Sequence, residues 1–596
     1  MDYPIEIRRH SAAHVMAAAI HRLFPEAKFG VGPTVENGFY YDIDIGRPVT
    51  PEDLAAIDKE MRAIVGQNPA FVRQELPIED AIRLFEELGQ TYKVELLNDL
   101  KTKGSTKVTA EESQDIDPQN VGSATIYRTG EFTDLCRGPH VAEAKDIGVW
   151  KLAKVSAAYW RGKESNPQMQ RIYGWCFETK EALDAFETMM AEAEKRDHKK
   201  LGPELDLFTF SDLVGPGLPL WTPKGTILRN TLDDFVWQLR GMRGYERVEI
   251  PHITKKDLYI KSGHWEKYQN DLFKITTREG HEFAMKPMNC PHHTQIYARR
   301  LWSYRELPQR YANTTMCYRD EQTGELSGLS RARSFTQDDA HVFCRMAQVK
   351  EEFLKVWDVI YDFYGAFGFD LRVRLSTHDP QQMEKYLGSP ERWSTAEQVL
   401  TEIVNEKKVD WFEGVGEAAF YGPKLDFLAK DSIGREWQVA TIQLDMNMPE
   451  RFDLVCVNEQ GERERIVMIH CAIMGSIERF LSIAIEHYAG AFPLWLAPVQ
   501  IAILPVADRH NAYARDLAHE LASLGLRAEV NEATDSVGKK IRSAEHNKYP
   551  LILVVGDKEA GGGEMTVRIR GEKDQRAMPK QEFIAWAVDM VKQKKS

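Results

Sequence analysis

Arginine and acidic residues recur in three separate segments of this 596-residue chain. Residues 243–251 follow a helix expected over 226–242 and end in a proline, and residues 318–339 place arginines at both ends of a polar loop. Residues 475–480 open an apolar helix with a glycine and carry Arg479 in its first turn. Arginine forks bind phosphate oxygens in pairs and helix N-termini attract anions, so the three segments together indicate a site for a phosphorylated nucleotide.

Each segment also has a structural interpretation. Taken alone, segment 243–251 is also typical of a helix-to-strand corner. Segment 475–480 is also typical of an ordinary helix N-terminus. A salt-bridged surface hairpin would account for Arg319, Glu321 and Arg331. Phe335 follows them on the expected second strand, where it can stack on a purine, so the combination favours the nucleotide site over the hairpin.

Cysteine and histidine spacing suggests a second kind of site. The seven cysteines are few, odd in number and free of any C-x-x-C pair, which is typical of a reducing compartment without disulfides or a zinc ribbon. His10 and His14 lie four residues apart on an expected helix and therefore share a face, while Cys136 and His140 flank a Gly-Pro pair in a loop. The four could bind a metal or line a polar cleft.

Composition excludes several classes of protein. Apolar residues make up 43% and charged residues 28%, as in globular proteins, and the length predicts three or four domains. The net charge of −13 argues against a protein that coats nucleic acid non-specifically. Acidic residues and histidines interrupt the apolar N-terminus, and charges and prolines interrupt residues 481–506, so we expect neither signal peptide nor membrane span but a cytoplasmic protein.

The pattern of expected helices and strands divides the chain into four regions. Residues 1–178 mix helices, such as 11–24, with short strands, and residues 179–201 predict one charged helix that ends at Gly202-Pro203. From 204 to 498, short strands do not alternate regularly with long helices, which predicts an antiparallel sheet flanked by helices. From 499 to 596 strands and helices do alternate, which predicts a small α/β domain with a largely parallel sheet.

Four long strings resemble one known family. They are MKPMNCPHH (285–293), RARSFTQDDAHVF (331–343), FYGPKLDF (420–427) and VMIHCAIMGSIERF (467–480). Together with the three arginine-bearing segments they resemble threonyl-tRNA synthetases, which are class II aminoacyl-tRNA synthetases, and the resemblance covers essentially the whole chain. It implies a multidomain α+β and α/β protein with an editing domain (1–178), a linker helix (179–203), a class II catalytic domain (204–498) and an anticodon-binding domain (499–596).

The resemblance implies a zinc ion, one per chain, held by Cys290, His341 and His470. One thiolate and two imidazoles suit zinc, and three protein ligands leave a coordination position open. An apolar pocket distinguishes threonine from valine only about 10²-fold, whereas a metal that binds the amino group and the hydroxyl excludes valine. The same resemblance places four further residues around the amino acid, namely Asp339 at the amino group with Gln337, Tyr421 and Gln443.

The implied reaction is ATP-dependent formation of threonyl-adenylate, followed by transfer of threonine to tRNA(Thr). Arg319 would stabilise charge on the α-phosphate, Arg331 and Arg479 would clamp ATP, and Mg²⁺ would bridge its phosphates. The resemblance assigns Glu321, Gln438 and Thr441 to the adenosine and Phe335 to the adenine ring. Lys424 and His264 match family positions close to the reacting groups.

A second reaction is implied because serine carries the same hydroxyl as threonine. The missing methyl group is worth only about 1–3 kcal/mol, so a separate hydrolytic site is expected. The resemblance favours hydrolysis of Ser-tRNA(Thr) by a metal-free site in the first region, made of His10, His14, Tyr41, Asp134, Cys136 and His140. In the last region it implies that Arg542, Glu559 and Arg568 read anticodon bases, and it implies a homodimer.

Several positions depart from the family pattern. Cys471 and His292 stand beside the expected metal ligands where arginine and glycine are usual, and Thr534 replaces a common asparagine. The His10 helix begins so near Met1 that we expect no preceding ubiquitin-like domain. The alternatives are a catalytically silent relative that binds RNA, which should have lost Arg319, Arg479 or a metal ligand, and a prolyl or histidyl synthetase. None of these residues is lost, which disfavours the silent relative. The Cys/His set and the separate first region disfavour a prolyl or histidyl synthetase.

Overall fold

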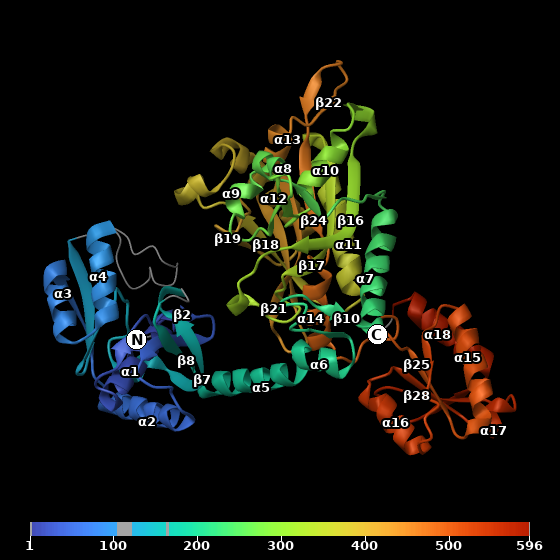
Figure 1. Ribbon diagram of the computed structural model, residues 1–596, viewed down its shortest axis with the longest axis horizontal. Helices are drawn as coiled ribbons and strands as arrows, with labels where there is room; N and C mark the ends of the chain where they lie inside the picture. The colour runs from blue at the N-terminus through green and yellow to red at the C-terminus, as the bar shows by residue number, and fades with distance from the viewer. Residues whose placement is uncertain (1–2, 104–121, 163–165, 595–596) are drawn as a thin grey trace. The chain divides into compact units, whose positions relative to one another are not determined.

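A computed structural model describes residues 3–103, 122–162 and 166–594. The chain divides into two compact units, Met1–Ala191 and Glu192–Ser596, which are shown in Figure 1 from blue to red along the chain. Among the described residues, no helix combines the length and the apolar character needed to cross a membrane.

The first unit contains two antiparallel sheets and the helices that cover them. One sheet has the order β1-β3-β8-β7, with β2 paired to β3, and the other has the order β4-β5-β6. The strands are β1 (Lys28–Phe29), β2 (Thr34–Val35), β3 (Gly38–Asp44), β4 (Phe71–Pro77), β5 (Ser123–Thr129), β6 (Phe132–Leu135), β7 (Val149–Tyr159) and β8 (Gln168–Phe177). The helices are α1 (Ile5–Leu23), α2 (Pro51–Gln67), α3 (Ile78–Glu87) and α4 (Thr91–Lys103), and the division between the units falls within α5 (Lys180–Arg196).

Helix α1 forms the centre of the first unit. Its alanines at 12, 13 and 17–19 are buried, and their small side chains let the helix lie close to β3 and β8. The helix expected over 11–24 is confirmed, but it begins earlier, at Ile5 directly after Pro4. This early start places His10 and His14 inside the helix rather than at its end.

The linker differs from its prediction of a single helix. Asp197 interrupts the helical run and accepts a hydrogen bond from the backbone N–H of Lys199 at 2.8 Å, so it caps a second helix, α6 (His198–Glu204). The prediction that the helix stops at Gly202-Pro203 is wrong, because α6 contains both residues and ends at Glu204. Aspartate is among the strongest helix N-cap residues, and this local signal divides the charged run.

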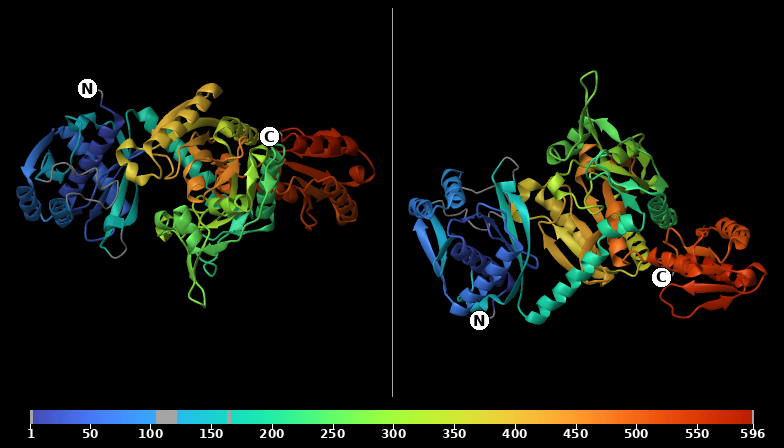
Figure 2. Two further views of the ribbon diagram at one scale, coloured as in Figure 1. Left: turned by 90° about the horizontal axis from the view of Figure 1, so that it is seen from above. Right: turned by 60° about the horizontal axis from the view of Figure 1, so that its bottom comes forward.

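The second unit is built on an eight-stranded sheet of order β11-β16-β17-β24-β21-β20-β18-β19. Its strands are β11 (Glu246–Arg247), β16 (Gln309–Tyr318), β17 (Ser334–Cys344), β18 (Asp370–Thr377), β19 (Trp411–Val415), β20 (Lys424–Lys430), β21 (Glu436–Asp445) and β24 (Val467–Ala472). The predicted antiparallel sheet is confirmed, except that the pairs at its two edges, β11–β16 and β18–β19, are parallel. Both views of Figure 2 show its strands in green to orange.

Helices cover this sheet and share its apolar core. They are α7 (Pro223–Gly241), α11 (Val349–Gly365), α12 (Pro390–Lys407) and α14 (Ile477–His487). Smaller elements complete the region: α8 (Lys256–Ser262), α9 (His264–Lys267), α10 (Cys290–Tyr297), α13 (Asn447–Arg451), β9 (Phe208–Thr209), β10 (Leu220–Trp221), β12 (Ile253–Lys255), β13 (Lys274–Thr276), β14 (Glu282–Met285), β15 (Trp302–Ser303), β22 (Val455–Val457) and β23 (Arg463–Arg465).

The last hundred residues form a five-stranded sheet of order β26-β25-β27-β28-β29. Its elements are β25 (Ile501–Pro505), α15 (Asn511–Ser523), β26 (Ala528–Val530), α16 (Val537–His546), β27 (Leu551–Val555), α17 (Asp557–Ala560), β28 (Met565–Ile569), β29 (Arg576–Met578) and α18 (Lys580–Lys592). The prediction of a largely parallel sheet is wrong for half of the pairs, since β27–β28 and β28–β29 are antiparallel. The connections before β28 and β29 are too short for a parallel crossover.

Candidate functional sites

A cavity of about 870 Å³ opens on the large sheet of the second unit. It is lined by nearly all residues expected at the aminoacylation site: Cys290, Arg319, Glu321, Arg331, Phe335, Gln337, Asp339, His341, Tyr421, Lys424, Gln438, Thr441, Gln443, His470 and Arg479. These residues are spread over almost 200 positions of the sequence, and the sheet brings them together.

Strand register explains how the sheet brings them together. Successive side chains of a strand point to opposite faces, so the alternate residues Phe335, Gln337, Asp339 and His341 of β17 share one face. His470 on β24 is the cross-strand neighbour of His341 on one side and of Gln443 on the other. The pairing therefore places the expected metal ligands beside the residues expected to contact the amino acid.

The ligand atoms of Cys290, His341 and His470 lie within 4.8 Å of one another, and all three residues are buried. His341 Nε2 and His470 Nδ1 are 3.1 Å apart. The other ring nitrogens are engaged elsewhere, His470 Nε2 with Asp445 Oδ2 at 2.9 Å and His341 Nδ1 with His293 Nδ1 at 2.8 Å. Such outer partners fix the rings of metal-binding histidines and leave the inner nitrogens free to coordinate.

The protonation of this group also suits a cation. Burial lowers the pKa of His341 well below its usual value, so its imidazole is neutral. Burial raises the pKa of the Cys290 thiol well above its ordinary value, with a further increase from the nearby carboxylates. A thiolate at this position therefore needs a compensating cation, which a zinc ion would supply. Burial also raises the pKa of Asp339 to about 6.

His264, expected near the reacting groups, lies behind the cavity wall. It is fully buried, with its Nε2 atom 3.6 Å from Cys290 Sγ and its Nδ1 atom 2.9 Å from Ser262 Oγ. Burial lowers its pKa to about 3, so the ring is neutral. The structure thus places His264 as a neighbour of Cys290.

Aromatic and acidic partners hold two of the arginines that line the cavity, Arg319 and Arg331. The Arg319 guanidinium lies 5.0 Å from the ring centre of Phe335 and 5.8 Å from that of Tyr268. Arg331 pairs with Glu321 at 2.7 Å. Arg479 follows the helix cap at Ser476, whose hydroxyl accepts a hydrogen bond from the Arg479 backbone N–H at 3.1 Å. This helix start faces the cavity and supplies positive charge there.

Asp426 is a functional candidate that the sequence analysis did not identify. Its buried carboxylate on β20 accepts hydrogen bonds from Lys424 Nζ at 2.7 Å, Thr441 Oγ1 at 2.8 Å and Gln438 Nε2 at 2.8 Å. It therefore orients three residues expected at the nucleotide. Lys424 and Asp426 are alternate residues of one strand, a signal that could have marked Asp426 as facing the same side.

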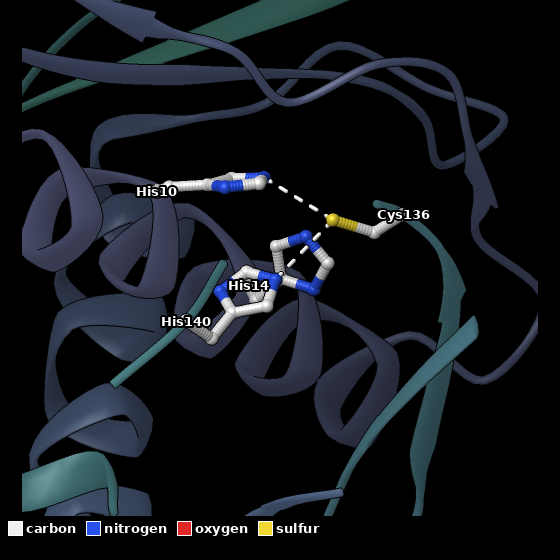
Figure 3. A group of neighbouring side chains, drawn as sticks. All are labelled: His10, His14, Cys136 and His140. Carbon is white, nitrogen blue, oxygen red and sulfur yellow. Dashed lines mark hydrogen bonds between the residues drawn. The ribbon is translucent and has the colours of Figure 1, made fainter. Parts of the chain in front are cut away.

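The first unit contains a second cluster, shown in Figure 3. His10 and His14 project from α1, and the ligand atoms of these residues, Cys136 and His140 lie within 4.8 Å of one another. Cys136 Sγ is 3.3 Å from His10 Nε2 and 3.2 Å from His140 Nε2. Burial lowers the pKa of His10 to about 4 and those of His14 and His140 well below their usual value, so all three rings are neutral.

Tyr41 and Asp134 adjoin this cluster. Tyr41 donates a hydrogen bond to Asp134 Oδ2, which lies 3.7 Å from His14 Nε2. Lys93, which the sequence analysis missed, is buried beside them, with its Nζ atom 2.8 Å from Asp134 Oδ1 and 3.1 Å from the Tyr41 hydroxyl. Its helix has the pattern of an ordinary surface helix, so nothing in the sequence marked this lysine as buried.

The residues expected to read the anticodon have different surroundings. Arg568 on β28 is partly exposed and approaches Glu545 of α16 at 3.7 Å, and Arg542 lies one turn before Glu545 on the same helix. Glu559 is instead buried, and its carboxylate accepts hydrogen bonds from Gly556 N at 3.0 Å and Thr566 Oγ1 at 3.1 Å. These contacts give Glu559 a structural role in shaping α17.

Three segments of the chain match models of known protein families. Residues 273–488 match the class II tRNA synthetase core domain of the G, H, P, S and T enzymes, and residues 500–590 match an anticodon-binding domain. Residues 124–173 match the second additional domain of threonyl- and alanyl-tRNA synthetases. The fold and these matches define the chain as a class II aminoacyl-tRNA synthetase.

Individual relatives narrow the assignment. The chain is 49% identical over 589 residues to a threonine–tRNA ligase of Gloeobacter violaceus, covering 97% of this chain and 91% of that protein. It is 47% identical to that of Phocaeicola vulgatus, covering 96% and 86%. A solved structure described as the RNA-binding domain of threonyl-tRNA synthetase from Cryptosporidium parvum Iowa II is 36% identical, with a TM-score of 0.63, covering 66% of this chain and 98% of that one. The chain belongs to the threonine–tRNA ligase family.

Proposed function

We propose that this protein attaches L-threonine to tRNA(Thr) through a threonyl-adenylate intermediate. One observation carries the proposal. The cavity that contains Cys290, His341 and His470 also contains arginines of the segments 318–339 and 475–480. Metal ligands and arginines in one cavity suit a reaction between a small hydroxylated amino acid and a nucleotide.

Residues of this chain can carry out the activation of threonine by ATP. Arg319 is held against Phe335, so it can stabilise the charge that develops on the α-phosphate when the threonine carboxylate attacks. Arg331 and Arg479 bind the remaining phosphates, which Mg²⁺ accompanies. Asp426 holds Gln438 and Thr441 toward the adenosine and Lys424 toward the reacting groups. Phe335 stacks on adenine, and Glu321 binds it at its edge.

A different group of cavity residues would select the amino acid. Cys290, His341 and His470 would hold one zinc ion, which supplies a Lewis acid for the amino and hydroxyl groups of threonine. Asp339 binds the amino group, and Gln337, Tyr421 and Gln443 enclose the side chain. His264 positions Cys290 from behind.

We further propose that residues 1–178 hydrolyse Ser-tRNA(Thr). Three neutral imidazoles, Cys136 and the Tyr41–Asp134–Lys93 group can orient the ester and a water molecule without a metal ion. His140 Nδ1 lies 3.1 Å from Ser11 Oγ, which also accepts a hydrogen bond from Val141 N and donates one to Ile7 O. This arrangement keeps the proton of His140 on Nδ1 and leaves its Nε2 as an acceptor facing the cluster.

The remaining assignments complete the proposal. Residues 179–203 link the editing domain to the catalytic domain (204–498), and residues 499–596 bind the anticodon through Arg542 and Arg568, with Glu559 shaping the surface. Sixteen basic against 14 acidic residues make this last region +2 within a chain of −13. The protein acts in the cytoplasm as a homodimer, for which exposed Leu213 and Val214, between β9 and β10, offer apolar surface.

Exchange of pyrophosphate into ATP tests the activation step. Threonine is expected to support fast exchange, serine slower exchange by a factor of about 10–200 for the missing methyl, and valine none above background. The measurement uses purified protein, Mg²⁺, labelled pyrophosphate and each amino acid in turn. Exchange that is faster with proline or histidine, or equal with threonine and valine, would overturn the proposal.

A further inference from the structure

His198 lies outside the cavity but contacts two segments that form its wall. It is the first residue of α6, is 3% exposed, and packs between α14 and the loop that joins β16 to β17. This loop, residues 319–333, carries Glu321 and Arg331, and its residue Leu329 lines the cavity. Helix α14 carries Arg479 at its other end.

Hydrogen bonds define the protonation of the His198 ring. The backbone N–H of Leu329 donates to His198 Nε2 at 3.1 Å, so this nitrogen carries no proton. His198 Nδ1 is therefore protonated and donates to Glu486 Oε1 at 2.7 Å. The backbone N–H of His198 donates to the same oxygen at 3.2 Å. Although Asp197 lies nearby, both ring nitrogens are engaged, so the Asp197–His198–Glu486 group is a hydrogen-bonded link rather than a set of metal ligands.

Close packing makes the link stiff. Gly328 adopts a positive φ of +54°, and a Cβ atom at this position would lie 2.4 Å from His198 Nε2. The next residue, Leu329, is buried in the core of the second unit. Residues 327–331 form a tight turn in which Arg331 N donates to Ser327 O at 3.4 Å and Ser330 N donates to Ser327 O at 3.0 Å. The position of Arg331 therefore depends on where Leu329 is held.

We propose that His198 is a positioning residue that fixes the loop 319–333 against helix α14 and thereby sets the affinity for ATP. The inference rests on the proposed function, since it assumes that Glu321, Arg331 and Arg479 bind the nucleotide. His198 joins the two walls that carry these residues, through its Nε2 atom on the loop side and its Nδ1 atom on the helix side. A linker helix thus contributes to substrate binding in the catalytic domain.

Two substitutions by amide side chains distinguish the hydrogen bond at His198 Nε2 from the hydrogen bond at His198 Nδ1. In His198→Gln the side-chain oxygen can occupy the place of Nε2 and accept from Leu329 N–H, whereas in His198→Asn the amide can replace only Nδ1 and donate to Glu486. We expect the dissociation constant for Mg·ATP, measured by calorimetric titration, to rise about tenfold in His198→Ala and His198→Asn, the cost of an unpaired buried N–H. His198→Gln should stay within about threefold of the wild type.

Leu201→Ala is the matched control, because it removes apolar packing from the same helix and leaves both hydrogen-bonding nitrogens of His198 in place. It should lower the melting temperature while leaving the dissociation constant for Mg·ATP and the KM for ATP in pyrophosphate exchange unchanged. If His198→Ala behaves like Leu201→Ala, or if the Gln and Asn variants bind Mg·ATP equally well, the inference is wrong. Wild-type protein that binds Mg·ATP but shows no threonine-dependent exchange would instead contradict the proposed function, and the titration still tests His198.

Discussion

Replacing Arg319 by alanine is expected to abolish threonine-dependent exchange of pyrophosphate into ATP. Its guanidinium stacks between Phe335 and Tyr268 on the cavity wall, where a fixed positive charge can meet the developing charge of the transition state. Loss of one such preorganised donor typically lowers the rate by about 10²–10³-fold, and loss of a full charge should cost at least that much. The rate of exchange at saturating ATP and threonine measures the effect.

The control for this variant is Arg372→Ala. Arg372 lies on β18 and forms an exposed pair with Asp410 at 3.0 Å, an interaction of the kind that contributes little to stability. Arg372→Ala should therefore exchange at the wild-type rate. If Arg319→Ala exchanges pyrophosphate at nearly the wild-type rate and its melting curve is unchanged, the assignment of Arg319 to the α-phosphate is wrong.

Replacing His14 by alanine is expected to abolish hydrolysis of Ser-tRNA(Thr) without slowing threonine activation. His14 is buried between His140 and the Tyr41–Asp134 pair, and its neutral ring can accept or relay a proton there. Loss of a positioned general acid or base lowers a rate by about 10²–10⁴-fold. Release of labelled serine from preformed Ser-tRNA(Thr) measures this rate, and pyrophosphate exchange measures activation in the same preparation.

His21→Ala serves as the comparison, since His21 lies on the same helix two turns further on, next to Phe132. It should leave deacylation intact. The editing assignment fails if the wild-type protein does not deacylate Ser-tRNA(Thr), or if His14→Ala retains the activity of the wild type. A loss of both deacylation and activation in His14→Ala would indicate that the substitution damages more than the editing site.

The sequence was most informative where one strand carries several functional residues. The family resemblance assigned Phe335, Gln337, Asp339 and His341 to one site, and the structure shows them as alternate residues of β17 that line one cavity. His10 and His14 could be placed together from helical spacing alone. Grouping Cys290 with His341 and His470 needed the family resemblance, because the contacts depend on the pairing of distant strands.

The sequence analysis mainly missed charged residues that are buried in the fold. Lys93 and Asp426 lie in segments whose patterns are ordinary for a helix and a strand, and only tertiary packing buries them beside their partners. The division of the linker at Asp197 is a local capping effect that outweighed the continuous helical composition. In the last region, only the four-residue helix α17 separates β27 from β28, and no helix separates β28 from β29. These short connections made the rest of the sheet antiparallel.

The central claim is that Cys290, His341 and His470 form the metal site that selects threonine, and the zinc content of the purified protein tests it most directly. We expect one zinc per chain in the wild type and in Cys136→Ala and Cys456→Ala, the last a buried cysteine outside both clusters. Cys290→Ala should lose the zinc together with threonine-dependent exchange. Zinc that is absent from the wild type, retained by Cys290→Ala or lost from Cys136→Ala would contradict the account.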